Sequence, residues 1–264
     1  MISRVFLLAG SLVFASVIQA DFDHSRWDAM LRKHVLTIGD GSVTQVDYAG
    51  MALEVSGLDD YLAATAAVTK LTFDSWALED QLAFLINVYN AATICLILTE
   101  YPDLESIRDI GNILRSPWSR EFVALFDGNV TLDDIEHDMI RGWNIYNEPR
   151  IHFAVNCAAI GCPPLRAEAY VGSKLHEQLD DNTRLFLSDR SRNYLESDRL
   201  YVSQIFNWYE EDFTRGWQGI DSIAEFIGLY ADALGLNPEQ QTALQQGGFS
   251  IGYLRYNWGL NRKR

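Results

Sequence analysis

Residues 79–100 read EDQLAFLINVYNAATICLILTE, a segment that is apolar on nearly every helical face. A helix of this kind lies in the centre of a folded domain or crosses a membrane. The amides Asn87 and Asn90 interrupt the apolar run, acidic residues bracket it at both ends, and Pro102 stops the helix soon afterwards. We therefore expect a buried central helix and not a membrane span.

Other segments predict shorter helices around this one. Apolar residues recur with helical periodicity over 24–36, 57–69, 170–188 and 221–236. A further short helix is expected over 131–141, because a side-chain oxygen in its TLDD start can cap the first turn.

Strands are expected at three places. Residues 43–48 alternate between polar and apolar side chains, and 200–205 lie between two amphipathic helices. Residues 150–157, RIHFAVNC, indicate a buried strand between a proline and a glycine- and proline-containing turn. No linker or internal repeat divides the rest of the chain. The predicted fold class is α+β: a single helix-rich domain with a small sheet and a central buried helix.

The composition is that of a globular protein. The chain has 264 residues, of which 48% are hydrophobic and 22% charged, so collagen-like and wholly disordered classes are excluded. Lys and Arg number 21 against 36 Asp and Glu, a formal net charge of −15. This charge argues against binding to nucleic acid or to an anionic membrane surface. We expect a small molecule or a peptide as partner, and we assign no cofactor.

Residues 1–20 are typical of a secretory signal peptide. Arg4 supplies a positive charge, the run from Val5 to Val17 is apolar or small throughout, and Ala20 offers a small residue for cleavage. The run is shorter than the ~20 apolar residues that a membrane span requires. We expect a signal peptide over 1–20, a single domain over 21–264, a periplasmic or secreted location, and no stable membrane insertion after cleavage.

Reactive side chains are densest in the middle of the chain, on the predicted helix over 131–141 and around the predicted strand over 150–157. A thiol nucleophile requires a base within hydrogen-bond reach and a third group that orients the base. The candidate catalytic residues are Cys157 or Cys162 as nucleophile, His137 or His152 as base, and Glu136 as the orienting acid.

Strand geometry limits the pairs that can form. In an extended strand His152 and Asn156 share one face, while Cys157 points to the other. A direct contact between His152 and Cys157 is then not expected, which makes His137 the better partner for Cys157. Asn156 or Asp133 could replace the glutamate as orienting group.

The same residues also have structural interpretations. Cys157 and Cys162 could form a disulfide that closes a short turn, and an oxidising compartment would permit both this bond and exchange chemistry at it. His152 could be a core histidine whose ring nitrogens bond to backbone, and Cys95 is expected in the core. A zinc site built from these cysteines and histidines lacks the usual CxxC or HExxH spacing, so no metal ligand is assigned.

Polar residues on the central helix form a second unusual feature. Asn87 and Asn90 are three apart and share one helical face. A buried amide destabilises the fold unless it is hydrogen-bonded, so this face must meet polar groups. The amides either hold the backbone of an adjoining loop or line the floor of a site. The aromatic stretch over 206–213, with Asp212, is expected to be packing with a polar edge. The candidate binding residues are Asn87, Tyr89, Asn90, Arg141 and Asn156.

Ordered motifs along the whole chain resemble the DUF547 family, whose name records that no function is assigned to it. The matching blocks are VDY at 46–48, FLINVYNA at 84–91, IRDIG at 107–111, LDDIEH at 132–137 with Ile140 and Arg141, RIHFAVNCAAIGCPPLR at 150–166, SQIFxWYxxDF at 203–213 and YNWxLN at 256–261, where x is any residue. Two positions depart from the pattern: Asn257 stands where similar proteins often carry Asp, and Ala158 where Gly is common.

This resemblance implies an exported bacterial member of the family, and it supplies no activity. Our leading hypothesis, from the residues themselves, is an exported thiol-dependent enzyme that performs acyl transfer or amide hydrolysis. The alternative is a non-catalytic binding module of the cell envelope, in which the cysteine, histidine and glutamate cluster holds the fold together. The alternative expects the cysteines to be paired or buried, with no histidine near either sulfur.

Overall fold

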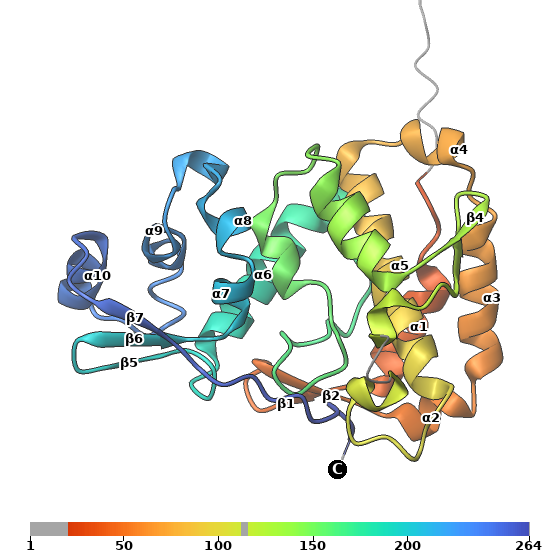
Figure 1. The fold of residues 1–264 in the computed structure, drawn as a ribbon, viewed down its shortest axis with the longest axis horizontal. Coiled ribbons are helices and arrows are strands. Elements are labelled where there is room, and N and C mark those ends of the chain that lie inside the picture. The colour runs from red at the N-terminus through yellow and green to blue at the C-terminus, as the bar shows by residue number, and fades with distance from the viewer. Residues whose placement is uncertain (1–20, 112–115, 264) are drawn as a thin grey trace, which may run out of the picture.

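The computed structural model describes residues 21–111 and 116–263. The predicted signal peptide over 1–20 lies outside the described residues. Over these residues the fold is α+β, as predicted, with many helices and three small sheets (Figure 1).

The predicted central helix is confirmed. Helix α5 spans Leu78–Leu98, and sixteen of its residues are buried. It is long and apolar enough to cross a membrane, yet 89% of its most apolar 18-residue window is buried inside the protein. The length and apolar composition that a membrane span requires are equally typical of a helix in the core of a folded domain.

The N-terminal part of the chain packs around this helix, at the right of Figure 1. Its elements are α1 (Ser25–His34), β1 (Val35–Ile38), β2 (Val43–Val46), α2 (Tyr48–Ala52), α3 (Val55–Ala66), α4 (Lys70–Asp74), η1 (Ile107–Ile110), η2 (Pro117–Ser119), β3 (Val123–Leu125) and β4 (Gly128–Val130). The pairs β1–β2 and β3–β4 are antiparallel hairpins. The predicted helices over 24–36 and 57–69 and the predicted strand over 43–48 are confirmed, with bounds that differ by a few residues.

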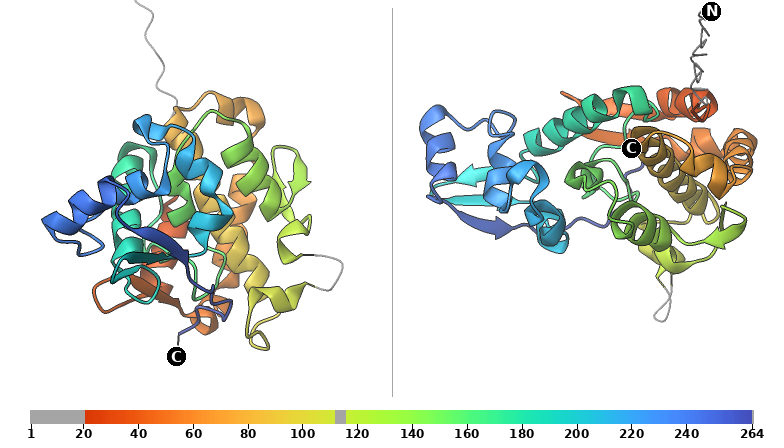
Figure 2. Two further views of the ribbon diagram at one scale, coloured as in Figure 1. Left: turned by 60° about the vertical axis from the view of Figure 1, so that its left-hand side comes forward. Right: turned by 90° about the horizontal axis from the view of Figure 1, so that it is seen from above.

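Most of the C-terminal elements lie at the other end of the molecule, to the left in Figure 1 and in the right-hand view of Figure 2, while the long helix that begins this part of the chain runs from the middle of the molecule. They are α6 (Leu175–Ser188), β5 (Tyr194–Glu196), β6 (Arg199–Val202), α7 (Ile205–Trp208), α8 (Glu210–Thr214), η6 (Trp217–Gly219), α9 (Ile223–Gly228), α10 (Pro238–Gln245) and β7 (Ser250–Tyr253). Strand β6 pairs antiparallel with β5 and parallel with β7. The predicted strand over 200–205 is confirmed as β6 and ends earlier, because α7 begins at Ile205.

Two predicted helices differ in extent. The helix predicted over 170–188 begins later, because residues Gly172–Lys174 form a short 3-10 turn, η5, and α6 starts only at Leu175. The segment over 221–236 forms the short helix α9 and then turns. The helix over 131–141 is confirmed as η3 (Asp134–Gly142), which has π-helical hydrogen bonding.

The predicted strand over 150–157 is wrong. Residues Pro149–Phe153 form a 3-10 helix, η4, and the following residues are irregular. Proline at the first helical position and Glu148, whose carboxylate accepts the Arg150 N–H, start this helix. Every residue over 149–156 is buried, including the polar residues Arg150, His152 and Asn156, so the alternation of polar and apolar side chains here does not mark the exposed face of a strand.

The buried side chains form two hydrophobic clusters that meet at η4. The larger cluster surrounds α5 and includes Ile151 and Ala154. The smaller cluster belongs to the C-terminal elements and includes Phe153, which contacts Phe186 and Phe206. The residues around His152 therefore lie where the two clusters join.

Candidate functional site

A cavity of about 260 Å³ lies near this junction. The candidate catalytic residues all line it, although they come from separate elements: Glu136, His137, His152, Cys157 and Cys162. Among the candidate binding residues, Tyr89 also lines it. Aromatic side chains supply much of the remaining wall, and Trp208 among them is 44% exposed. They are Trp118, Trp208, Tyr209, Tyr256 and Trp258.

Helix η3 brings Glu136 and His137 to the cavity. Its start is fixed by two reciprocal hydrogen bonds: the Asp134 N–H donates to Oγ1 of Thr131 at 2.9 Å, and the Thr131 N–H donates to the Asp134 carboxylate at 2.7 Å. Glu136 is 7% exposed, and its Oε1 accepts a hydrogen bond of 2.7 Å from the Tyr209 hydroxyl. The predicted role of Glu136 as orienter of a histidine is therefore replaced by a bond to a tyrosine.

His137 is held by Arg141, one helical turn further along. Nη1 of Arg141 lies 3.0 Å from Nδ1 of His137, and because the guanidinium can only donate, Nδ1 is the acceptor. The imidazole side chain is 39% exposed. Arg141 also donates from Nε to Asp212, so its charge is already paired.

His152 is paired with Asp212, which lies on α8. Nε2 of His152 is 2.7 Å from Oδ2 of Asp212, and the imidazole stacks on Tyr209 with ring centroids 3.9 Å apart. Burial opposes ionisation of Asp212, but hydrogen bonds from His152 and Arg141 outweigh it and hold the pKa of Asp212 well below its ordinary value. The carboxylate is therefore charged and can only accept a hydrogen bond.

The imidazole of His152 is neutral at neutral pH. Burial lowers the pKa of His152, and the neighbouring Asp212 only partly opposes this shift. Since Nε2 carries the proton that Asp212 accepts, Nδ1 is left as a lone-pair acceptor. This Nδ1 atom is buried without a hydrogen-bond partner among the described residues. An imidazole oriented by an anionic carboxylate, with its second nitrogen unprotonated, has the form of a general base.

Cys157 and Cys162 form a disulfide, with their Cα atoms 6.2 Å apart. Sγ of Cys162 accepts hydrogen bonds from the Cys157 N–H at 3.0 Å and from the Ala159 N–H at 3.4 Å. The Tyr256 hydroxyl lies 3.2 Å from each of the two sulfurs. Among the described residues, the hydrogen-bond partners of the sulfurs are these backbone groups and Tyr256, and none is a histidine.

The disulfide closes a loop over residues 157–162, and the C-terminal segment over 256–261 holds this disulfide loop in place. The Ile160 N–H donates to the Gly259 carbonyl at 2.7 Å, and the Gly161 N–H donates to the Asn257 carbonyl at 2.8 Å. A Cβ at position 161 would lie 2.9 Å from the Tyr256 ring, so only glycine allows this approach. The packing thereby sets Tyr256 beside the sulfurs.

Asn156 anchors the beginning of the same loop and does not line the cavity. Its side chain donates to the Pro163 carbonyl at 2.8 Å and accepts the Ala158 N–H at 2.9 Å. Its backbone N–H donates to Oδ1 of Asn90 at 2.8 Å. Asn156 is therefore a structural residue of the loop.

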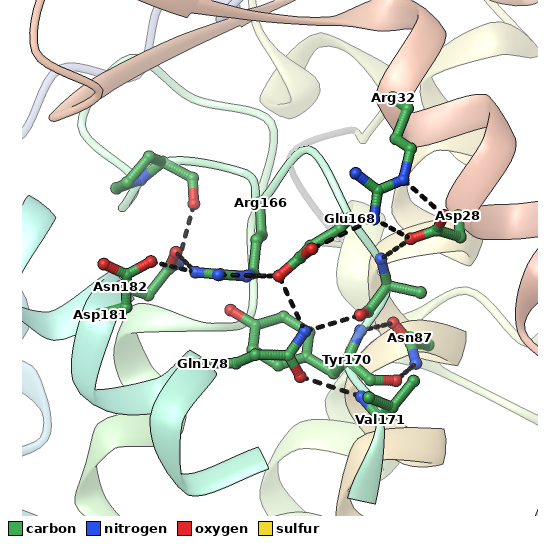
Figure 3. Close-up of polar contacts among 12 residues, drawn as sticks. Asp28, Arg32, Asn87, Arg166, Glu168, Tyr170, Val171, Gln178, Asp181 and Asn182 are labelled. Atoms are coloured by element: carbon green, nitrogen blue, oxygen red, sulfur yellow. Dashed lines mark hydrogen bonds and ion pairs between the residues drawn. The ribbon is translucent and has the colours of Figure 1, made fainter. Parts of the chain in front are cut away.

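The two amides of α5 hold loops, which is the first of their two predicted roles. Asn87 donates to the Tyr170 carbonyl at 2.7 Å and accepts the Tyr170 N–H at 3.0 Å (Figure 3). Asn90 donates to the Ala154 carbonyl at 3.0 Å and accepts the Asn156 N–H. Neither amide lines the cavity, while Tyr89 between them does.

Three site residues were missed by the sequence analysis: Asp212, Tyr209 and Tyr256. The first two were interpreted as packing with a polar edge. The signal that could have identified Tyr209 and Asp212 is that a phenol and a carboxylate stand three residues apart in one motif. The motif does not reveal that they bond to Glu136 and His152, because these partners lie far away in sequence.

The remaining predictions concern metals and Cys95. Among residues 21–111 and 116–263, no group of three or more His, Cys, Asp and Glu side chains is placed to hold a metal ion. Cys95 is a free thiol in α5 and partly buried. Burial raises the pKa of the Cys95 thiol, which makes it a poor nucleophile.

Comparison with known proteins supports the family resemblance over part of the chain. Residues 73–187 match the family described as protein of unknown function, DUF547. This segment contains α5, η3 and the disulfide loop, whereas Asp212 and Tyr256 lie beyond it. No curated protein and no solved structure matches the chain.

Proposed function

We propose that the chain is an exported thiol-dependent enzyme that performs acyl transfer or amide hydrolysis in this cavity. The observation that carries the proposal is the convergence of both sulfurs, a carboxylate-oriented imidazole and Glu136 on one cavity open to solvent. The enzyme acts in its dithiol form, because the thiolate is the nucleophile and a disulfide sulfur is not. That form arises when an external thiol reductant supplies two electrons to the Cys157–Cys162 disulfide.

Roles follow from exposure and hydrogen bonding. Cys157 is the nucleophile, because it is partly exposed whereas Cys162 is 3% exposed. Its thiolate attacks the substrate carbonyl carbon, and the tetrahedral intermediate collapses to a thioester as the leaving group departs. His152 receives the thiol proton and delivers it to the leaving group, and Asp212 orients the imidazole throughout. Water then hydrolyses the thioester, or another acceptor takes the acyl group.

The cavity wall favours a neutral or cationic substrate with an apolar group. Two of the described lining residues are carboxylic acids, Asp133 and Glu136, and none is Lys or Arg. Trp208 and Trp258 stack with ring centroids 5.7 Å apart, and Tyr256 packs against both. Aromatic faces beside carboxylates attract cations and apolar groups and repel anions.

An exported location is part of the proposal. A disulfide beside the cavity fits an oxidising compartment, since such compartments allow structural and exchangeable disulfides to persist. The composition of residues 1–20 supports the same location.

Cysteine replacement tests the enzyme directly. The protein is reduced and assayed on amide, ester and thioester substrates that carry neutral, cationic or anionic groups. Cys157→Ala is expected to lower the rate on a reactive substrate about 10³-fold or more, as loss of a nucleophile does. Cys95→Ala is the matched control, because Cys95 is a free thiol of α5 that does not line the cavity, and it is expected to keep the wild-type rate. Unchanged rates for both Cys157→Ala and Cys162→Ala would contradict the proposal.

The second candidate function is a non-catalytic binding module of the cell envelope. The pairing of both sulfurs and the absence of a histidine among their described hydrogen-bond partners favour it. In that case the native oxidised protein binds its ligand with full affinity, and reduction changes binding only by loosening the loop. Inertness of reduced wild-type protein towards the whole substrate panel would favour this candidate.

A further inference from the structure

We infer that the Cys157–Cys162 disulfide is a thiol–disulfide exchange site, which a neutral or cationic thiol attacks at Cys157 while Cys162 leaves. This activity goes beyond acyl transfer and does not depend on it. It rests on an asymmetry between two bonded sulfur atoms and on the charge of the cavity that leads to them.

The two sulfurs differ in access. Cys157 is partly exposed, whereas Cys162 is 3% exposed, and both line the cavity. A thiolate attacks along the S–S axis and must reach the sulfur that it bonds to. Cys157 is therefore the sulfur that an incoming thiolate meets.

The two sulfurs also differ in hydrogen bonding. Sγ of Cys162 is approached by the N–H groups of Cys157 and Ala159 and by the Tyr256 hydroxyl. The described partner of the Cys157 sulfur is the Tyr256 hydroxyl alone. Donors that point at a sulfur stabilise its thiolate, and a thiol of lower pKa leaves faster in exchange. Cys162 is therefore the better leaving group.

Tyr256 is suited to act as one of these donors. Burial raises the pKa of the Tyr256 phenol above its ordinary value, so it keeps its proton through the pH range in which thiols react. Its position is fixed by the packing of its ring on Gly161 and by the hydrogen bonds of the adjoining backbone.

The exchange balances in two steps. A thiolate RS⁻ attacks Sγ of Cys157, a bond forms between the R sulfur and Cys157, and the bond to Cys162 breaks with its electron pair remaining on the Cys162 thiolate. A second thiolate attacks the R sulfur, which forms RSSR and releases the Cys157 thiolate. The protein disulfide gains two electrons, and two thiols of the reacting class are oxidised.

The cavity selects the thiol by charge. Asp133 and Glu136 line it without a Lys or Arg among the described lining residues. Two arginines lie behind the wall, where they contact His137 and the Cys162 carbonyl, but each is paired with a carboxylate: Arg141 with Asp212 and Arg192 with Asp189. This field attracts a cationic thiol and repels an anionic one, and salt weakens both effects.

The first experiment maps the attacked sulfur. Oxidised full-length protein is exposed briefly to cysteamine, quenched in acid and alkylated, and the modified peptides are identified by mass spectrometry. The expected intermediate carries cysteamine on Cys157 and the alkyl group on Cys162. A mixed disulfide on Cys162 would overturn the assignment.

The second experiment measures rates of reduction by cysteamine, 2-mercaptoethanol and mercaptoacetate at low salt. Each rate is expressed per thiolate and divided by the rate of the same thiol on a small reference disulfide. Cysteamine is expected to exceed mercaptoacetate by about tenfold, with the difference shrinking as salt is added. Equal normalised rates would overturn access through the acidic cavity.

The third experiment tests the leaving group. Tyr256→Phe is expected to slow reduction by cysteamine about fivefold, because one donor to Cys162 is lost. Tyr253→Phe is the matched control, since Tyr253 lies on β7 outside the cavity, and it is expected to react like the wild type. If both variants were reduced at equal rates and only in denaturant, the disulfide would be purely structural, and this result would overturn the inference.

Discussion

The carboxylate of Asp212 lies 2.7 Å from Nε2 of His152 and also accepts a hydrogen bond from Arg141. His152 and Asp212 are 60 residues apart in sequence and are both largely buried. Because the carboxylate fixes which ring nitrogen carries the proton, it determines that Nδ1 is the basic atom. The chemistry available to the cavity therefore depends on Asp212, which lines a neighbouring hollow on the Arg141 side.

Replacement of Asp212 by Asn is expected to lower the pKa of His152 further. Burial and the charge of Arg141 would then lower the pKa of His152 with only Glu136 opposing them, since the Asp212 carboxylate that favours the charged imidazole is gone. The pKa is read from the pH dependence of the His152 Cε1–H signal by NMR. Asp189→Asn is the control, because buried Asp189 pairs with Arg192 away from His152. A raised or unchanged pKa of His152 in Asp212→Asn would contradict this electrostatic account.

Tyr209→Phe is expected to destabilise the protein by about 1–3 kcal/mol. The variant keeps the aromatic ring on His152 but leaves buried Glu136 without the hydroxyl donor at 2.7 Å. Urea unfolding measures the free energy of unfolding, with Tyr253→Phe as the comparison at a more exposed tyrosine. Equal stability of the two variants would mean that Glu136 finds another donor.

Asn87→Ala and Asn90→Ala are each expected to cost about 2–4 kcal/mol, because each leaves a buried backbone N–H and carbonyl unpaired. Only Asn90→Ala releases the loop that leads into the disulfide, so only this variant is expected to speed the reaction of the disulfide with cysteamine. Urea unfolding and reduction rates measure the two effects. Equal reduction rates in both variants would show that the hydrogen bonds of Asn90 do not affect the reaction of the disulfide.

Acidification is expected to destabilise the protein through His24. Burial lowers the pKa of His24 to about 4, and its Nδ1 lies 2.8 Å from the Tyr61 hydroxyl. In the unfolded chain His24 has a pKa near 6.5, so between pH 6.5 and pH 4 the unfolded chain binds a proton that the folded protein does not. The contribution of His24 to stability is therefore complete above pH 6.5 and is lost as the pH falls below it. The loss amounts to about 3 kcal/mol by pH 4.

His24→Asn isolates this contribution. The asparagine keeps an acceptor for the Tyr61 hydroxyl but does not titrate, so the variant is expected to lose about 3 kcal/mol less than the wild type between pH 7 and pH 4. Urea unfolding at pH 7 and pH 4 gives the loss in free energy of unfolding for the wild type and for the variant. Parallel losses in wild type and variant would exclude His24 as the sensitive group.

Features with a local cause could be predicted from the sequence. The central helix follows from an apolar run with two isolated amides, and the start of η3 follows from the spacing of Thr131 and Asp134. The departure at Ala158 also has a local meaning: its φ of 61° lies in the left-handed region that glycine adopts freely, at a cost of about 1–2 kcal/mol for alanine.

Features that depend on distant contacts could not be predicted. The sequence indicates a strand over 150–157, whereas the folded protein buries even the polar residues of this segment, because two hydrophobic clusters that meet only in the folded protein enclose them. The pairing of His152 with Asp212 and of Glu136 with Tyr209 likewise joins residues far apart in the chain. The list of reactive residues was therefore predictable, and the assignment of partners among them was not.

The amides of α5 have a consequence for the motions of the two irregular segments that they hold. The N–H groups of Asn156 and Tyr170 belong to irregular segments, yet their acceptors are side chains in the middle of the most deeply buried helix. Their deuterium uptake should consequently be as slow as that of α5 itself, because the bonds open only when the whole protein unfolds. Irregular backbone beside the sulfurs thus has the rigidity of the protein interior.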